Sequence, residues 1–327
     1  MATHFVITDA GISETDQAPG QISVYIAPGE SDAPGIREQF HLDDYDYSST
    51  LDIDEVPRMD VSPERALIIW KRPRSFKPHE AIELGVSVVG LILTRDRLGI
   101  VANEDEIPFS SREFRGCRDV GDVFLRLLLH TIRHYVGHLR AIKQMSVELE
   151  KKITVSMENR HLLRMFSLSE SLVYYIDAIE GNGAVLSKLR GAASDLGLTP
   201  KQQQFLDDII LENNQAARQA GIFSTILSGL MDARGTIINN NMTVLLKNLT
   251  LINIVFLPLN LIAGIWGMSE WTMATRGIDW RISYGGITLG LAALGLLTWV
   301  FVTRLIEAST ARSARKSTGE GPARRNG

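Results

Sequence analysis

Residues 249–268 (LTLINIVFLPLNLIAGIWGM) constrain this chain more than any other stretch. They run for 20 residues without a charged side chain, and at 1.5 Å of rise per residue a helix of this length spans a hydrocarbon core of roughly 30 Å. The run nevertheless contains Asn253, Pro258 and Asn260, and polar groups at membrane depth usually face a bundle interior or a water-filled path. Because Asn253 and Asn260 lie seven residues apart, they share one helix face. We therefore expect this face to line a pore.

A second charge-free run covers residues 282–303, between Arg281 and Arg304. It contains four glycines, and small residues let membrane helices approach closely. Five further Arg and Lys follow Arg304. By the positive-inside rule we expect a hairpin of two spans in the inner or plasma membrane, with both termini in the cytoplasm. Two spans cannot enclose a conduction path, so a channel requires several copies around a symmetry axis.

Charge is distributed unevenly in a chain whose net charge is only −4. Residues 1–60 hold 13 Asp and Glu against two Arg. Either these acidic residues solvate a cytosolic head, or they attract cations towards a pore mouth. Cys117 is the single cysteine, which excludes an intramolecular disulfide. The N-terminus lacks the basic start and apolar run of a signal peptide, so we expect most of the protein in the cytoplasm.

Hydrophobic periodicity divides the chain into segments. Alternating apolar runs predict strands at residues 66–70, 86–93 and 98–103, with the extreme N-terminal segment partly disordered. Helical spacing begins near residue 120, and the segment 180–184 (EGNGA) is a point where we expect a helix to break or bend. The expected order is an α/β cytosolic domain (1–118), a helical region (119–198), a stalk helix (199–246), a pore-lining span (247–268), an extracytoplasmic loop (269–281), a second span (282–304) and a basic cytoplasmic tail (305–327).

The stalk has a clear start signal. Thr199 and Gln202 form a capping-box pattern around Pro200 at the first helical position. No proline follows before Pro258. A continuous helix from residue 200 to residue 265 would be about 100 Å long, and would transmit changes in the head to the pore as tilt or rotation.

Three histidines, His130, His134 and His138, recur every four residues on one predicted helix. Two imidazoles one helical turn apart converge, so the pattern is compatible with a metal site. The competing interpretation is a set of polar surface or interface residues, because the neighbouring sequence shows no acidic partner for them.

A family resemblance is carried by residues 256–269, which read FLPLNLIAGIWGMS. This segment resembles the pore helix of the CorA family of two-span divalent-cation transporters, whose members usually read F-x-P-L-T-x-I-A-G-I-Y-G-M-N at the membrane exit. The likeness is strong over residues 200–305 and architectural before that. It implies a funnel-shaped homopentamer in a lipid membrane, with divalent cations as substrate and regulator, no covalent cofactor and no nucleic-acid partner.

The departures from the family pattern bear on ion selection. The resemblance places the pore mouth at Gly267, Met268 and Ser269, where Ser269 replaces the Asn whose amide holds a hydrated cation. Mg²⁺ dehydrates reluctantly, so such a ring binds its first-shell water. Asn260 stands where relatives have threonine, and Asn253 where they are small or apolar. We expect the polar rings to have moved to these two asparagines. The competing interpretation is hydrogen bonding between helices around a degenerate pore.

The resemblance also implies a gate and a regulatory site. Leu246, Leu249 and Leu257 fall on the pore face where apolar rings would exclude water and ions. Asp208 lies where the family has an acidic site between subunits that binds a divalent ion in the closed state, with Asp207 and Glu212 as further candidates. An ordinary solvated helix position explains Asp208 equally well.

Three functions therefore compete. The first is a channel for hydrated Mg²⁺ or related Co²⁺, Ni²⁺ or Zn²⁺. The second is a ZntB-like zinc transporter, and the third is a pentameric membrane scaffold that has lost transport with the signature Asn. The sequence contains no nucleotide-binding loop, zinc-protease motif or hydrolase elbow, so we do not expect an enzyme.

Overall fold

The computed structural model describes residues 2–8, 11–74, 84–103, 109, 111–155, 159–266, 273 and 277–317. The chain divides into two compact units, Met1–Arg234 (unit 1) and Gly235–Gly327 (unit 2). The helices are α1 (Ala33–Phe40), α2 (Asp44–Ser49), the short 3₁₀ helix η1 (Arg112–Phe114), α3 (Val120–Val155), α4 (Asn159–Ala192), α5 (Pro200–Trp266) and α7 (Trp280–Ser317). The long helix α5 contributes to both units.

Unit 1 contains a seven-stranded sheet in the order β2-β1-β3-β7-β6-β5-β4. The strands are β1 (Ala2–Thr8), β2 (Gly11–Thr15), β3 (Ile22–Ile26), β4 (Arg58–Val61), β5 (Ala66–Pro73), β6 (Val86–Leu93) and β7 (Leu98–Ala102). Neighbouring strands are antiparallel except for the parallel pair β3 and β7. The three strands predicted between residues 66 and 103 are confirmed. The expectation of a disordered N-terminal segment is wrong for the described residues, because β1 pairs with both β2 and β3.

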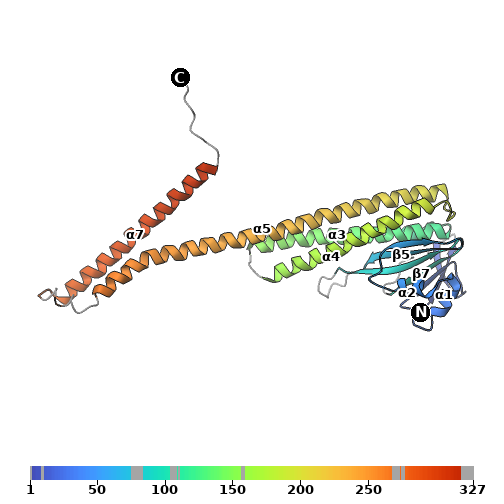
Figure 1. Cartoon of the computed structure of the whole chain (residues 1–327), viewed down its shortest axis with the longest axis horizontal. Coiled ribbons are helices and arrows are strands. Elements are labelled where there is room, and N and C mark those ends of the chain that lie inside the picture. Colours follow the sequence, from blue (N-terminus) through green and yellow to red (C-terminus); the bar gives the residue numbers. More distant parts are fainter. Residues whose placement is uncertain are drawn as a thin grey trace, which may run out of the picture. The chain divides into compact units, whose positions relative to one another are not determined.

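The sheet is covered on both faces, as the alternation along β5 requires. Leu67 and Ile69 point to one side, where they pack with residues of α1 and α2. Ile68 and Trp70 point to the other side, into the larger core formed with α3, α4 and the first part of α5. Figure 1 shows these three helices running side by side next to the sheet. The α/β class expected for the first part of the chain is confirmed.

The glycine-containing segment 180–184 does not break α4, which continues through it. Asn182 is fully buried, and its side chain accepts from the backbone N of Lys71 (3.1 Å) and donates to the backbone O of Lys71 (2.7 Å). β4 pairs with β5 only as far as Ile69, so this amide takes the place of a strand partner two residues further along β5, at Lys71. Gly181 lies so close to Pro57 that a Cβ would sit 2.7 Å from its Cγ. The sequence signal marks close packing of a helix on a sheet rather than a helix end.

The predicted start of α5 is confirmed. The Thr199 hydroxyl accepts from the backbone N of Gln202 (3.3 Å), and the Gln202 side chain accepts from the backbone N of Thr199 (2.9 Å). This is the reciprocal arrangement of a capping box. Gln202 is itself buried and also donates to Asp119 and Asp122 at the beginning of α3. The cap therefore ties the starts of two long helices together.

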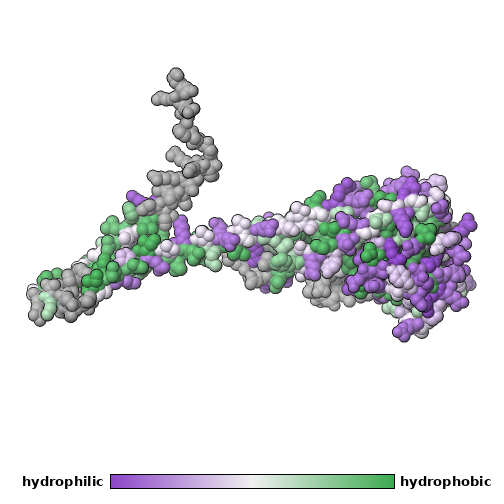
Figure 2. Space-filling model, viewed as in Figure 1, coloured by the Kyte–Doolittle hydropathy of each residue, from purple (hydrophilic) through white to green (hydrophobic). Residues whose placement is uncertain are grey.

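Unit 2 consists of the second part of α5 and of α7. Two stretches are long and apolar enough to cross a membrane, one ending at Ile265 in α5 and one at Arg281–Arg304 in α7. Most large apolar side chains of these stretches are exposed in the single chain. Figure 2 shows the described surface of unit 2 as predominantly hydrophobic, whereas that of unit 1 carries many hydrophilic residues. The two C-terminal apolar helices of the predicted fold class are thus confirmed.

Candidate functional site

The predicted pore face of α5 is exposed. Asn253 and Asn260 both lie on the solvent-accessible side of the single chain. Within the part of unit 2 whose side chains are described, only Leu251 and Val255 are buried. Each of these lies two residues from Asn253, which places it about 160° away around a helix with 3.6 residues per turn. The two asparagines therefore share a face opposite to the packed one.

The packed face of α5 meets α7 through a glycine. A Cβ added to Gly295 would lie 3.1 Å from Cδ1 of Leu259, so the missing side chain lets the two helices approach. Leu259 lies on the same side of α5 as Leu251 and Val255, because four residues advance a helix by little more than one turn. The hairpin of unit 2 thus uses the side of α5 that carries no asparagine.

The three leucines expected to form the gate are also exposed. Leu246, Leu249 and Leu257 have relative exposures of 57%, 56% and 69%. Such large apolar side chains need lipid or another protein surface around them. They lie on or beside the asparagine face, so the face alternates between amides and apolar groups.

Pro258 is the one proline in the interior of α5, beyond Pro200 at its first position, and it interrupts the hydrogen bonds of the helix backbone. Proline has no backbone N–H, so the carbonyl of Ile254 lacks its usual donor four residues later. This leaves a backbone acceptor one residue after Asn253. The expected pore mouth, Gly267, Met268 and Ser269, lies outside the described residues.

Asp208 is exposed on the first part of α5 and lines a pocket of about 470 Å³ that also includes Arg118 and Lys201. Asp207 and Glu212 were the further candidate ligands. Asp207 forms an ion pair with Arg190, with 2.5 Å between Asp207 Oδ1 and Arg190 Nε. Glu212 lies 3.7 Å from Arg133 of α3. Among the described residues of one chain, no group of three or more His, Cys, Asp and Glu is arranged to hold a metal ion.

The histidine row of α3 has partners that the sequence did not reveal. Glu113 of η1 lies 2.5 Å from Nδ1 of His130 and 3.0 Å from Nη1 of Arg133. Burial alone would raise the pKa of Glu113, but the hydrogen bonds with His130 and Arg133 outweigh it and lower that pKa. Further along the helix, Nδ1 of His138 lies 2.6 Å from the hydroxyl of Tyr175 in α4. Glu113 is the acidic partner that the sequence near the histidines lacks, and it lies 17 residues before His130 in the chain.

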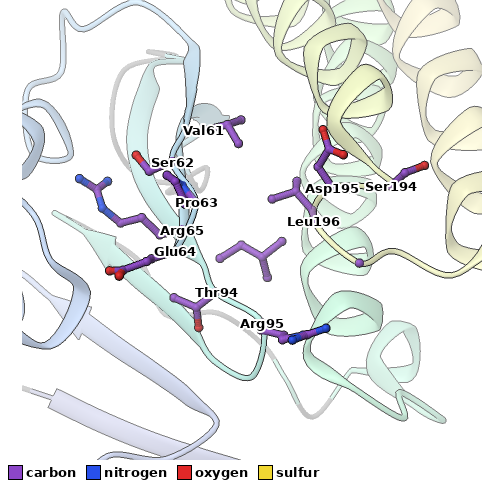
Figure 3. A pocket seen from close by; sticks show the side chains of 12 residues that line it. Val61, Ser62, Pro63, Glu64, Arg65, Thr94, Arg95, Ser194, Asp195 and Leu196 are labelled. Atoms are coloured by element: carbon purple, nitrogen blue, oxygen red, sulfur yellow. The ribbon is translucent and has the colours of Figure 1, made fainter.

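A second pocket, of about 620 Å³, lies in unit 1 between the turns after β4 and β6 and the link from α4 to α5. In Figure 3 the side chains of Val61, Ser62 and Thr94 lie on one side of it, and Asp195 and Leu196 on the other. It contains none of the residues predicted for a site. Its lining mixes both charges with apolar groups, which indicates no particular ligand.

Comparison with known proteins identifies relatives over most of the chain. A sequence model of the family described as "CorA-like Mg2+ transporter protein" matches residues 24–304. The protein described as cobalt/magnesium transport protein CorA from Methanocaldococcus jannaschii is 24% identical over 225 residues, covering 67% of this chain and 70% of that protein. The protein of the same description from Thermotoga maritima is 28% identical over 154 residues, covering 47% of this chain and 42% of that protein.

Solved structures share the fold. The complete CorA magnesium transporter from Methanocaldococcus jannaschii has a TM-score of 0.71 at 19% identity, covering 93% of this chain and 96% of that chain. The full-length CmaX protein has a TM-score of 0.70 at 12% identity, covering 92% and 96%. The cytoplasmic domain of ZntB from Vibrio parahaemolyticus has a TM-score of 0.57 at 10% identity, covering 73% and 98%.

Proposed function

This chain belongs to the family of CorA-like Mg²⁺ transporter proteins, and on that premise we propose that it conducts hydrated divalent cations through a pore lined by α5. Members of this family are transporters rather than enzymes. Two relatives are described as cobalt/magnesium transport proteins, which makes Mg²⁺ and Co²⁺ the first ions to test.

One observation carries the proposal. Asn253 and Asn260 lie on the side of α5 that the hairpin leaves open, opposite the buried Leu251 and Val255. Amides in a membrane span need polar partners. Since the face turned to α7 carries apolar side chains, the partners come from water or from other copies of the chain.

The path requires several copies of the chain. One hairpin presents only one lining helix, so closure around a path needs cyclic symmetry. We take the copy number from the family and propose a homopentamer. From the basic tail we propose that the spans lie in the inner or plasma membrane, with both termini in the cytoplasm.

Two amide rings would select the ion through its hydration shell. Amide oxygens of Asn253 and Asn260 accept hydrogen bonds from water molecules bound to Mg²⁺, which the ion gives up reluctantly. Rings at two levels offer successive binding positions. In this proposal the hydroxyl of Ser269 has a minor role, and Gly267 and Met268 shape the mouth.

We assign the gate to leucines on or beside the asparagine face of α5, and the regulatory site to the first part of the same helix. Rings of Leu246, Leu249 and Leu257 would close the path by excluding water. Asp208, whose neighbour Asp207 is already paired with Arg190, is the carboxylate we propose to bind a regulatory divalent ion between copies.

Flux through proteoliposomes tests the proposal. The full chain is reconstituted with an entrapped Mg²⁺, Co²⁺ or Zn²⁺ indicator, and the initial rate is compared between wild type and Asn260→Leu. We expect Asn260→Leu to reduce flux at least about tenfold, since losing a ring of solvating acceptors raises the barrier by more than about 1.4 kcal/mol. Asn260→Thr restores the residue usual in the family and should retain most of the flux.

Four outcomes would count against the proposal. Wild-type oligomers that are intact and pass no divalent ion would favour the scaffold. Asn260→Leu with wild-type flux would remove the relocated ring, and loss of flux in Ser269→Ala would return selection to the pore mouth. Flux of Zn²⁺ without Mg²⁺ or Co²⁺ would favour the ZntB-like alternative.

A further inference from the structure

His134 and His138 lie together on α3. Their ring centroids are 4.5 Å apart with the planes at 74°, whereas His130 and His134 are 6.4 Å apart. Two histidines four residues apart on a helix are the spacing found in helical zinc sites. Of the three histidines, the second and third are therefore the pair positioned to share one ion.

The orientation of His138 is held by a second residue. Its Nδ1 lies 2.6 Å from the hydroxyl of Tyr175, and the two rings stack at 5.9 Å with an interplanar angle of 21°. Tyr175 is fully buried, so its ring is fixed by the core. Because Nδ1 is engaged, Nε2 is the nitrogen left to coordinate. Metal-bound histidines typically have their other ring nitrogen held in this way.

One side of the pair borders open space. His134 is half-buried and His138 is buried. Gly137, which directly precedes His138 in the sequence, is exposed, and a Cβ added to it would meet nothing within 4 Å. The surface next to Gly137 is therefore not filled by a neighbouring side chain.

We propose that His134 and His138 form a two-imidazole site for a transition-metal cation such as Zn²⁺ or Ni²⁺, with water completing the coordination. Imidazole favours these ions, whereas Mg²⁺ prefers oxygen ligands and keeps its water. The site has two protein ligands per chain, consistent with the absence of a three-residue metal cluster among the described residues. It does not depend on ion conduction by α5.

Metal titration of the full chain tests the site. The protein is purified without a polyhistidine tag, stripped with chelator, and titrated with Zn²⁺ or Ni²⁺ in excess Mg²⁺. We expect the number of bound ions per chain to be one higher in wild type than in His134→Ala. His130→Ala is the matched control, because it removes a histidine from the same helix face and should keep that ion. With Cu²⁺ as a probe, the electron paramagnetic resonance spectrum should show coupling to two imidazole nitrogens in wild type and in His130→Ala, but not in His134→Ala.

The Tyr175→Phe variant tests the orientation of His138. It keeps both imidazoles and the packed ring, and we expect the affinity to fall about tenfold, as when the partner of a metal-bound histidine is removed. Equal stoichiometry and equal nitrogen coupling in wild type and His134→Ala would overturn the proposal. So would a wild-type chain that binds no Zn²⁺ or Ni²⁺ in the presence of excess Mg²⁺. Flux in liposomes is not needed for either result.

Discussion

The two parts of α5 bury their side chains in opposite ways. Before residue 235 the helix turns a regular stripe inward, with buried residues three or four positions apart through most of its length: Gln202, Leu206, Ile209, Asn213, Ala216, Ala220, Leu227 and Arg234. After residue 235 only Leu251 and Val255 are buried among the side chains that the structure describes. Polar residues differ as well, since the buried Asn213 donates to the backbone O of Ile179 at 3.0 Å, while Asn253 and Asn260 are exposed.

This difference shows that different contacts stabilise the two parts of α5. Burial of apolar surface holds the first part of α5 against α3 and α4 within one chain. The second part exposes its apolar side chains, so it needs lipid, α7 or further copies of the chain. A substitution should therefore change folding in the first part, and conduction or assembly in the second.

The largest expected contrast is between two leucines of α5. Leu206→Ala empties a fully buried position and should cost about 4 kcal/mol of folding free energy, through lost transfer energy and a cavity. Leu257→Ala removes a side chain that is 69% exposed, so unit 1 should change by no more than about 0.5 kcal/mol. Denaturant unfolding of the full chain in detergent, followed by tryptophan fluorescence, measures both. Equal losses would mean that the second part is also positioned by its own chain.

Acid should weaken unit 1 through His138. Its pKa falls from 6.5 to about 4 on folding, so between these values the unfolded chain binds the proton and the folded chain does not. Stability therefore decreases as the pH is lowered from 6.5 to 4, by about 3 kcal/mol from this group. Unfolding midpoints across this range should fall less steeply in His138→Gln than in wild type. An identical slope in both would show that the folded chain protonates His138 normally.

Two asparagines allow a matched test. Asn182→Leu removes the amide that pairs with both backbone groups of Lys71, and should cost about 2 kcal/mol because those groups become unsatisfied. Asn260→Leu is the same chemical change on the exposed face and should leave unit 1 unchanged. Faster hydrogen exchange at the Lys71 amide should accompany only the first variant. Protection that survives in Asn182→Leu would contradict the role of this amide as a strand partner.

The smallest expected effect lies at the start of α5. Thr199→Ala removes the hydroxyl that accepts from the backbone N of Gln202 and should cost about 1 kcal/mol, a typical value for an N-cap. Thr199→Ser keeps the hydroxyl and should be close to wild type. The same denaturant series measures both variants. A loss as large as that of Leu206→Ala would indicate that the cap also organises the contacts to α3.

Much of the fold was predictable because its signals are local. Charge-free length predicted both spans, alternation predicted the strands between residues 66 and 103, and the Thr199–Gln202 pattern predicted where α5 begins. Other elements lacked such signals. The strands β1 and β2 are held by pairing with each other and with β3, and the short helices α1 and α2 pack their apolar residues on the sheet.

The sites depended on contacts that no local pattern records. The asparagine stripe followed from a spacing of seven residues, but only the packing of Leu259 on Gly295 showed which side of α5 faces α7. Similarly, the histidine spacing was visible in the sequence, whereas Glu113 and Tyr175 reach that row from 17 and 37 residues away.

The sequence alone determined two apolar helices long enough to cross a membrane, the continuous helix that contains the first of them and the family resemblance, because hydrophobic period and length are properties of neighbouring residues. The tertiary structure decided which faces are buried, which polar groups are partnered and which histidines approach each other. Those outcomes depend on side chains far apart in the chain meeting at close packing, where a missing methyl group at Gly295 or a single amide at Asn182 sets the contact.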